Sequence, residues 1–354
     1  MKKLLIISRQ QFGYLVDIYK WCEHLSDEYQ IEVVTFDGKE KIALDRPNVK
    51  IHYVSYKGNK TLRGIRYILV TLWHMLFFKG CIMVEYFNGC SIFKKLLPWK
   101  KMILDIRTLS IKKDEESRTA ENNIIKQTCE KYDFTTIISD GTRKAISLDD
   151  NKSAILPLGS DIISTTDKKY DELRLLYVGT LSGRDIHKTI EGLGIYLKEN
   201  PDTNIHYDII GDGYAGELDA LKSQACKIGI EEYITFHGFV PHNKITPYLD
   251  NCNVGVSFVP MTRCYEHQPP TKTYEYILSG LYTIATGTFS NKEIITAKNG
   301  ILIDDTAEAF AEGLAQISRI ADTLKSDTIR ETLSDSTWEI IVRDRLEKIL
   351  TTTK

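Results

Sequence analysis

The stretch LRLLYVGTLSGR, residues 173–184, is an apolar strand pattern that runs into two glycines and an arginine. A strand, a glycine-bearing turn and a following helix expose backbone N–H groups at the turn, where an anion can bind. The helix expected after this turn covers residues 189–197, and the next strand covers residues 205–210. This order predicts a βαβ unit with parallel strands, and Arg184 adds a positive charge beside its turn.

The same alternation of strand and helix patterns continues on both sides of this unit. Towards the C-terminus we expect strands at 233–236, 254–258 and 282–286, and helices at 217–228, 245–250 and 274–279. Towards the N-terminus we expect a helix at 15–25 and strands at 4–7, 31–35, 82–85, 102–106 and 136–138. The predicted fold class is α/β, with two doubly wound Rossmann-like domains that face a cleft at the carboxyl ends of their strands.

The restart of the pattern near residue 173 divides the chain of 354 residues into two domains. We expect an N-terminal Rossmann-like domain over residues 1–160 and a C-terminal one over residues 172–335. Residues 161–171 are expected to form a linker, because Ser, Thr and Asp dominate them. Residues 336–354 are expected to form a C-terminal helix, which such an architecture can return to the N-terminal domain.

Composition excludes several classes of protein. Hydrophobic residues at 42% and charged residues at 27% are globular values, which exclude a disordered or disulfide-stapled chain. The seven cysteines form no C-x-x-C pair, so we expect reduced thiols and no metal site. The apolar run at 4–7 is too short for a signal peptide, and the one at 67–78 is too short to cross a bilayer. A cytoplasmic protein is therefore expected.

Charge is unevenly distributed along the chain. Residues 1–160 carry 26 Lys and Arg against 19 Asp and Glu, whereas the rest of the chain carries 20 against 29. Residues 57–113 alone carry twelve basic and two acidic residues, interleaved with aromatic and aliphatic side chains. This pattern favours peripheral contact with an anionic membrane, and the residues singled out for it are Lys94, Lys95, Trp99, Lys100 and Lys101. The alternative is a core helix with a solvated basic rim, and no motif indicates nucleic acid.

The stretch YEHQPPTKTYEYILSG, residues 265–280, is the second motif that carries chemistry. Its two prolines end an extended loop and open a helix, which places Lys272 in the first turn and Glu275 one turn later on the same face. A cation and a carboxylate then point together into the predicted cleft. The alternative is an ion pair between the two on the helix surface.

Six segments occur in a fixed order along the second half of the chain. They are LYVGTLS (176–182), IIGDG (209–213), ITFHGFVP (234–241), PPTKTYEYILSG (269–280), IAT (284–286) and KNGI (298–301). In this order they resemble the C-terminal half of a GT-B retaining glycosyltransferase of the group-1 (family 4) superfamily. The resemblance implies a nucleotide-diphospho-sugar donor as substrate and no cofactor or metal. The sequence has no Asp-x-Asp triplet, which agrees with a metal-independent enzyme.

The resemblance also assigns roles by position. It makes Glu275 the carboxylate that binds the ribose hydroxyls, while Lys272 and Arg184 clamp the diphosphate. Phe239 and Val240 would meet the base through their backbone. The other donor-binding residues that it implies are Gly179, Thr180, Gly211, Asp212, Gly238, Glu266, His267, Thr288 and Asn291. Retention implies front-face attack by the acceptor hydroxyl, so no side-chain nucleophile is required.

In the N-terminal domain the resemblance implies catalytic positions for Asp105 and Arg107, where Arg107 replaces a histidine of many members. Gly13 is expected on the acceptor side. The expected function is hexosyl transfer to a hydroxyl of a glycan or lipid-linked acceptor, in surface polysaccharide synthesis at the inner face of the cell membrane. Two alternatives stay open. They are a non-hydrolysing sugar-nucleotide epimerase and a non-catalytic GT-B homologue that binds a glycan or a partner protein.

Overall fold

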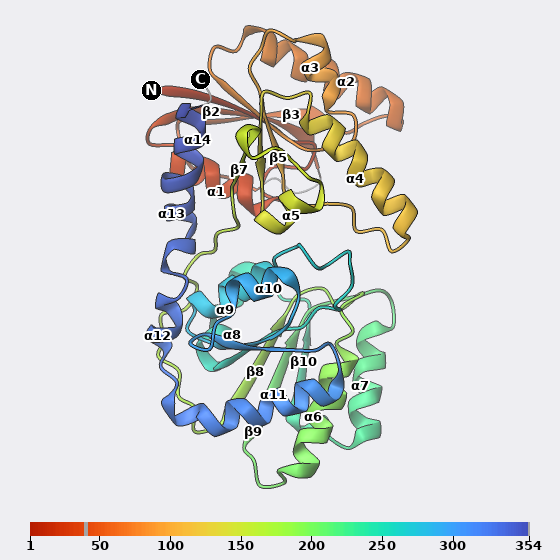
Figure 1. The fold of residues 1–354 in the computed structure, drawn as a ribbon, viewed down its shortest axis with the longest axis vertical. Coiled ribbons are helices and arrows are strands. Elements are labelled where there is room, and N and C mark those ends of the chain that lie inside the picture. Colours follow the sequence, from red (N-terminus) through yellow and green to blue (C-terminus); the bar gives the residue numbers. More distant parts are fainter. Residues whose placement is uncertain (39–41, 353–354) are drawn as a thin grey trace. The chain divides into compact units, whose positions relative to one another are not determined.

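The computed structural model describes residues 1–38 and 42–352 and divides into two compact units (Figure 1). Unit 1 contains residues 1–159 and the segment that begins at Trp338, and unit 2 contains residues 160–337. Each unit is built on one parallel β-sheet with helices on its faces, so the predicted α/β class is confirmed.

Among the described residues, seven parallel strands form the sheet of unit 1, in the spatial order β3-β2-β1-β4-β5-β6-β7. Their bounds are β1 Lys2–Ile7, β2 Tyr29–Asp37, β3 Val49–Ser55, β4 Cys81–Glu85, β5 Ile103–Ile106, β6 Phe134–Ile137 and β7 Ser153–Ile155. The run from Leu4 to Ile7 is fully buried, because helices cover both faces of the sheet. The strand order reverses between β1 and β4, where doubly wound sheets bind ligands at their carboxyl edge.

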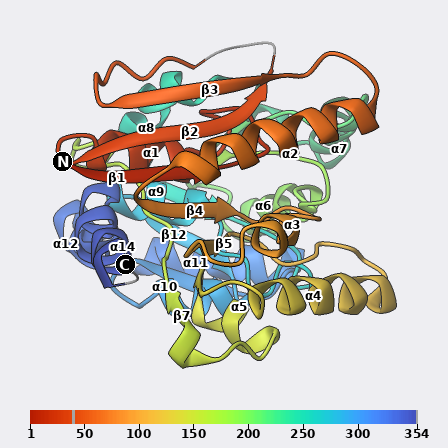
Figure 2. The same cartoon turned by 90° about the horizontal axis from the view of Figure 1, so that it is seen from above.

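The helices of unit 1 cover the two faces of this sheet (Figures 1 and 2). They are α1 Val16–Leu25, α2 Lys60–Phe77, α3 Ser91–Leu96, α4 Glu115–Cys129, α5 Asp140–Ala145, α13 Trp338–Ile341 and α14 Glu347–Thr352, with a π-helical turn at Val342–Leu346. Leu5 and Ile7 pack with residues of α2 to α4 in one core cluster. The C-terminal helices pack beside α1, and Lys2 of β1 forms a 2.6 Å ion pair with Glu347 of α14.

In the described part of unit 2, six parallel strands follow the order β10-β9-β8-β11-β12-β13. They are β8 Leu173–Val178, β9 Ile205–Ile210, β10 Ile234–Gly238, β11 Val254–Ser257, β12 Tyr282–Thr286 and β13 Gly300–Ile303. The helices are α6 His187–Glu199, α7 Glu217–Ile228, α8 Thr246–Asn251, α9 Thr271–Leu278, α10 Phe289–Ile294, α11 Ala307–Ile320 and α12 Ser326–Glu331. The order reverses between β8 and β11, so the predicted ligand edge of this unit lies at the ends of these two strands.

Helix packing keeps that edge in place. Helix α6 lies against α11, and a Cβ on Gly192 would come within 2.5 Å of the Ala307 carbonyl oxygen. On α9, the hydroxyl oxygen of Tyr276 accepts the Val178 N–H at 2.8 Å. This bond fixes α9 to the end of β8.

The predicted linker at 161–171 is held against unit 2. Ser164 donates its hydroxyl to the Asp250 carboxylate at 2.6 Å, and the backbone N–H of Lys168 donates to the Ser326 hydroxyl at 2.8 Å. Asp250 lies at the end of α8 and Ser326 begins α12, so the segment spans two helices of this unit.

Glu85, the last residue of β4, gives unit 1 a pH-dependent stability. Its carboxylate accepts a hydrogen bond from the Ser8 hydroxyl at 2.8 Å, and burial raises its pKa to about 7. A carboxyl whose pKa rises on folding stabilises the protein below its unfolded pKa, and this contribution is lost as pH rises through the folded pKa.

We therefore expect Glu85→Gln to gain stability relative to the wild type as pH rises from about 4.5 to about 7. The gain in unfolding free energy should reach at most about 3 kcal/mol, because the amide does not ionise. Urea unfolding at a series of pH values measures it, with the exposed Glu130→Gln on the same unit as control. Parallel stability profiles for Glu85→Gln and the wild type would contradict the assignment.

Candidate active site

Three glycine turns follow β8, β9 and β10 at the carboxyl edge of unit 2, and hydrogen bonds join them. The N–H of Gly179 donates to the Ile210 carbonyl at 3.0 Å, and the N–H of Gly211 donates to the Gly238 carbonyl at 2.8 Å. A Cβ on Gly211 would lie 1.9 Å from the Gly179 carbonyl oxygen, so this approach of two backbones requires glycine. The structure thus brings together the three glycines predicted for donor binding.

Lys272 points its ammonium group at the first of these turns. It lies in the first turn of α9, which begins directly after Pro270. Its Nζ lies 3.7 Å from the ring centroid of Tyr177 and would lie 3.1 Å from a Cβ on Gly179. Within residues 1–38 and 42–352 this buried Nζ has no hydrogen-bond partner.

Burial lowers the pKa of the Lys272 ammonium well below its usual value, and the nearby charge of Arg184 lowers it further. Glu275 acts in the opposite direction and raises this pKa. A buried cation without a partner destabilises a fold, and a bound anion removes that cost. The position is therefore suited to hold an anionic group of a ligand.

Arg184 is the second cation of this edge. Its guanidinium carbon lies 4.4 Å from the ring centroid of Tyr265, a cation–π contact that orients the planar group. The turn that carries it contains Gly183 and Asp185, both with positive φ. No carboxylate in the described part of the chain pairs with Arg184, so its N–H groups are available to a phosphate.

Glu275 lies on the same helix face as Lys272 but does not pair with it. Its Oε1 lies 2.8 Å from Nε2 of His242, which belongs to the turn after β10. The carboxylate side chain is 12% exposed and the His242 side chain is 63% exposed, so the histidine covers a buried acid. Among the described residues the predicted alternative, an ion pair between Lys272 and Glu275, is not formed. The sequence analysis did not predict a role for His242. Its position directly after the ITFHGFVP segment is the feature that could have indicated one.

Glu266, His267, Thr288 and Asn291 shape the loop that precedes α10. The Glu266 carboxylate accepts the Phe289 N–H at 2.8 Å, and the His267 ring packs 5.0 Å from the Phe289 ring. Thr288 caps α10 by accepting the Asn291 N–H at 3.2 Å. Thr288 and Asn291 are fully buried, so their side chains act within the loop.

The remaining predicted donor residues lie on the same edge. The Thr180 carbonyl accepts the Tyr177 hydroxyl at 2.6 Å, which fixes the turn beneath Lys272. Asp212 is exposed and accepts the N–H of Gly213 at 2.8 Å. Phe239 is 74% exposed beyond β10, and Val240 packs against a core cluster. An exposed aromatic ring beside backbone turns is available to stack on a base.

In unit 1, Asp105 and Arg107 form a buried network. The Arg107 guanidinium donates to the Leu156 carbonyl at 2.7 Å and to Asp17 of α1, and lies 3.7 Å from Asp105. Asp105 also accepts the Thr136 hydroxyl at 2.6 Å, and burial raises its pKa to about 6. These contacts hold α1 against the ends of β5 and β7, so Asp105 and Arg107 stabilise the packing of unit 1.

Unit 1 has a cavity of about 750 Å³ at the carboxyl ends of β1 to β4. Arg9 lines it, with its guanidinium carbon 5.8 Å from the ring centroid of Phe36 and 5.2 Å from that of Phe87. Tyr56 and Lys57 line it from the end of β3. Gly13, the predicted acceptor-side residue, lies in the loop after β1 with φ +86° and a close neighbour in Ile42.

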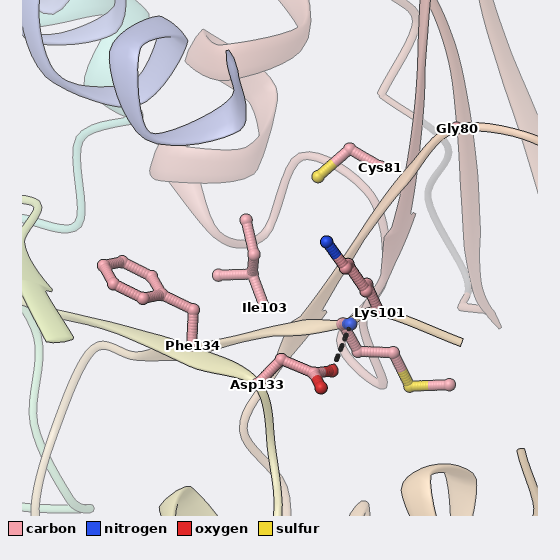
Figure 3. A pocket seen from close by; sticks show the side chains of 7 residues that line it. Gly80, Cys81, Lys101, Ile103, Asp133 and Phe134 are labelled. Atoms are coloured by element: carbon pink, nitrogen blue, oxygen red, sulfur yellow. Dashed lines mark hydrogen bonds between the residues drawn. The ribbon is translucent and has the colours of Figure 1, made fainter. Parts of the chain in front are cut away.

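A smaller cavity, of about 260 Å³, opens at the amino ends of β4, β5 and β6 (Figure 3). Its lining is mainly apolar, with Cys81, Ile103 and Phe134 around it. The Asp133 carboxylate beside it accepts the Met102 N–H at 2.8 Å. This edge is opposite to the ligand edge of a parallel sheet, so the cavity carries no part of the candidate site.

The residues singled out for a membrane surface differ in their contacts. Lys94 forms an ion pair with Asp133 at 2.7 Å, and Lys100 donates to the Phe78 carbonyl at 2.8 Å. Trp99 is 67% exposed, and Lys95 and Lys101 are also exposed. Lys94 and Lys100 are therefore engaged in the fold. No helix within the described residues is long and apolar enough to span a bilayer.

Comparison with known proteins shows what the part of the chain that holds this edge resembles. Residues 172–319 match the family model of glycosyl transferases group 1. This stretch of unit 2 is therefore similar to the group 1 glycosyl transferases. Lys272, Glu275 and the glycine turns all lie within the matched residues.

Solved structures extend the likeness to the whole chain. Sucrose-phosphate synthase from Thermosynechococcus elongatus superposes with a TM-score of 0.76 at 16% identity, covering 100% of both chains. A glycosyltransferase from Rickettsia africae gives 0.76 at 12% identity, covering 99% of this chain and 98% of its own. Anabaena HepE in complex with UDP and glucose gives 0.76 at 12% identity, covering 99% and 100%. The predicted GT-B fold is thereby confirmed. No curated protein matches this chain significantly.

Replacing Lys272 tests the anion site of unit 2. We expect Lys272→Met to raise the stability of the ligand-free protein by about 1–3 kcal/mol, because an apolar side chain replaces an unpartnered buried cation. If UDP occupies this site, it should stabilise the wild type and leave Lys272→Met unchanged. Thermal unfolding with and without UDP measures both effects.

The exposed Lys198→Met on α6 is the matched control, and it should leave both quantities unchanged. A Lys272→Met protein that is less stable than the wild type and still stabilised by UDP would exclude Lys272 from the anion site.

Proposed function

We propose that this protein transfers a sugar from a nucleotide-diphospho-sugar to a hydroxyl of a glycan or lipid-linked acceptor, with retention of anomeric configuration. The observation that carries the proposal is the buried, unpartnered ammonium of Lys272 beside Arg184 and the glycine turns. Two cations and backbone N–H groups suit a diphosphate. The match of residues 172–319 to the group 1 family model supports a nucleotide donor, and so does the likeness to Anabaena HepE, whose structure was solved in complex with UDP and glucose.

Charge development explains what these groups do. When the glycosidic bond to the diphosphate breaks, negative charge grows on the phosphate oxygens and the sugar becomes oxocarbenium-like. Lys272 and Arg184 stabilise that growing charge, so their contribution is larger in the transition state than in the ground state. The acceptor hydroxyl attacks the sugar from the face that the diphosphate leaves, and the released phosphate takes the proton of this hydroxyl. No metal ion is required for this step.

Glu275 would accept hydrogen bonds from the ribose hydroxyls of the nucleotide. Its carboxylate is already buried, and its observed partner is the mostly exposed His242. Movement of the histidine side chain would free one carboxylate oxygen for the ribose. A charged acceptor binds hydroxyls more strongly than a neutral one, which gives the site its preference for a ribonucleotide.

The acceptor would bind in the cavity of unit 1. Its aromatic side chains suit the apolar faces of sugar rings, and its lining carries two basic residues, Arg9 and Lys57, against one carboxylate, Asp37. This composition favours an acceptor that carries a phosphate or carboxylate, as the lipid-linked precursors of surface polysaccharides do.

A panel of labelled UDP- and GDP-sugars tests the proposed function. Transfer to an added acceptor, or slow hydrolysis of one donor without metal, is the expected result. Formation of an epimeric nucleotide sugar would instead indicate the epimerase, and binding without turnover would indicate a non-catalytic homologue. Loss of wild-type activity on addition of a chelator would contradict metal independence.

In the same assay, Glu275→Gln should lower kcat/KM by roughly 10- to 100-fold, because the amide loses a charge-assisted bond to the ribose. The exposed Glu199→Gln on α6 is the control and should leave kcat/KM unchanged. Wild-type kcat/KM in Glu275→Gln would show that this carboxylate does not contact the donor.

We further propose that unit 1 binds an anionic membrane surface through α2. The α2 outer face is defined by six apolar side chains that are each 44–66% exposed: Leu62, Ile65, Leu69, Trp73, Leu76 and Phe77. The opposite face of the helix buries Tyr67, Thr71 and Met75. A helix that packs in the core would not leave this apolar stripe in water, so the sequence-based alternative of a core helix does not describe α2.

Charge favours lipid as the occupant of the α2 outer face. Residues 57–79 carry five basic residues and no acidic one. Each lysine or arginine near an anionic bilayer contributes about 1 kcal/mol. A symmetric contact with a second copy would instead bring the same cations together, which opposes such a dimer.

Co-sedimentation with liposomes of phosphatidylcholine and phosphatidylglycerol tests this surface. Binding should require the anionic lipid, fall with salt and be lost in Leu69→Ser/Trp73→Ser/Phe77→Ser. Tyr214→Ser, which removes an even more exposed aromatic side chain on unit 2, should bind normally. Loss of binding in Trp99→Ser alone would assign the surface to the segment around Lys94 instead. Equal sedimentation with neutral and anionic liposomes would exclude an electrostatic membrane site.

A further inference from the structure

Two histidines and a glutamate meet beneath α2, on the face of the unit 1 sheet that this helix covers. Glu32 lies on β2, His52 on β3 and His74 near the end of α2. Along β2, Glu32 precedes Val34 and Phe36, whose side chains belong to the core cluster under α2. The three polar residues therefore extend that apolar interface at the amino-terminal half of β2, away from the ligand edge.

The ligand atoms of this cluster are close to one another. The Glu32 Oε2 lies 2.8 Å from Nε2 of His52 and 3.5 Å from Nδ1 of His74. One ligand atom from each of the three residues can be chosen so that all lie within 4.8 Å of one another. Ligands at about 2.0–2.2 Å from a tetrahedral ion are separated by roughly 3.4 Å, which these positions nearly satisfy.

The chemistry of the donor set matches a borderline divalent metal ion. Two imidazoles and a carboxylate are a ligand set that proteins use for zinc. The two imidazole rings lie with centroids 4.1 Å apart, where two charged rings would repel each other.

The solvent access of the cluster and the charges around it are also compatible with a bound ion. The side chains are 19–36% exposed, which leaves an open side through which an ion and a water ligand can reach the cluster. The charged neighbour that faces the cluster is Lys50, which pairs with Glu32 in the register of β2 and β3 and is exposed. The cluster of Glu32, His52 and His74 could not be predicted from a local sequence pattern. The three residues are far apart in the chain and follow no metal-binding spacing.

We propose that Glu32, His52 and His74 form a binding site for a Zn²⁺ ion that joins β2, β3 and α2. An ion held by all three elements stabilises the packing of α2 on the sheet. The site lies in unit 1 outside the donor-binding edge, and the proposal does not rest on the proposed function.

Titration of EDTA-treated protein with ZnCl₂, in the presence of a non-thiol reductant, tests the site. We expect one equivalent to bind and to raise the thermal unfolding midpoint. Co²⁺ in place of Zn²⁺ should give the visible absorption of a tetrahedral site with nitrogen and oxygen ligands. His52→Ala/His74→Ala should weaken Zn²⁺ binding by more than about 100-fold, since even outer partners of metal ligands are worth roughly 10- to 100-fold.

Control variants distinguish loss of Zn²⁺ binding from loss of folding. His187→Ala/His206→Ala, a pair on unit 2, should bind Zn²⁺ as the wild type does. Glu32→Gln keeps a hydrogen-bond acceptor but loses the anionic ligand, so it should fold in EDTA like the wild type and bind Zn²⁺ more weakly. Absence of a bound equivalent in the wild type, or equal Zn²⁺ binding in the wild type, Glu32→Gln and His52→Ala/His74→Ala, would overturn the proposal.

Discussion

The buried ammonium of Lys272 is the constraint on which the candidate site depends. A cation in this position costs stability unless an anion joins it. In the described part of the chain Glu275 offsets that cost only through its nearby charge, and no group forms a hydrogen bond with the ammonium. Its neighbours are a tyrosine ring, a glycine turn and a second cation, Arg184. The folded protein therefore carries an electrostatic cost that the proposed diphosphate would relieve. Because that relief would grow as the leaving group gains charge, the same arrangement would both bind the proposed donor and accelerate its cleavage.

The rest of unit 2 serves to hold this cation in place. The bond between Tyr276 and Val178 fixes α9 to β8, and the glycine turns extend the sheet far enough to form a backbone surface in front of Lys272. Glu266 joins the loop before α9 to the start of α10. Such a rigid edge does not have to reorganise when charge develops on a ligand. Unit 1 departs from this pattern, since its Arg107 is already paired with both Asp105 and Asp17.

The parts of the fold that are buried on all sides were predictable from the sequence. The strand at 4–7 is a continuous apolar run, and those at 173–178 and 205–210 are apolar at most positions, so the sequence pattern reveals them directly. Strand β3 was missed because polar residues interrupt its apolar pattern: His52 is half-buried and Lys50 is exposed. Helix α4 was missed because it buries only three of its fifteen residues and so has little apolar periodicity. For helix α2 the apolar pattern was recognised but its environment was not. An apolar sequence does not distinguish a helix buried in the core from one whose apolar face is exposed. The pair of His242 and Glu275 depends on a contact across 33 residues, which local patterns do not contain.

A crystal structure of the protein with bound UDP tests the central claim most directly. We predict a diphosphate oxygen within about 3 Å of the Lys272 Nζ, and ribose hydroxyls that donate to the Glu275 carboxylate. We also expect the glycine turns after β8 and β9 to keep their positions. UDP bound at another place, with the Lys272 ammonium still unpartnered, would contradict the assignment of Lys272 to the diphosphate.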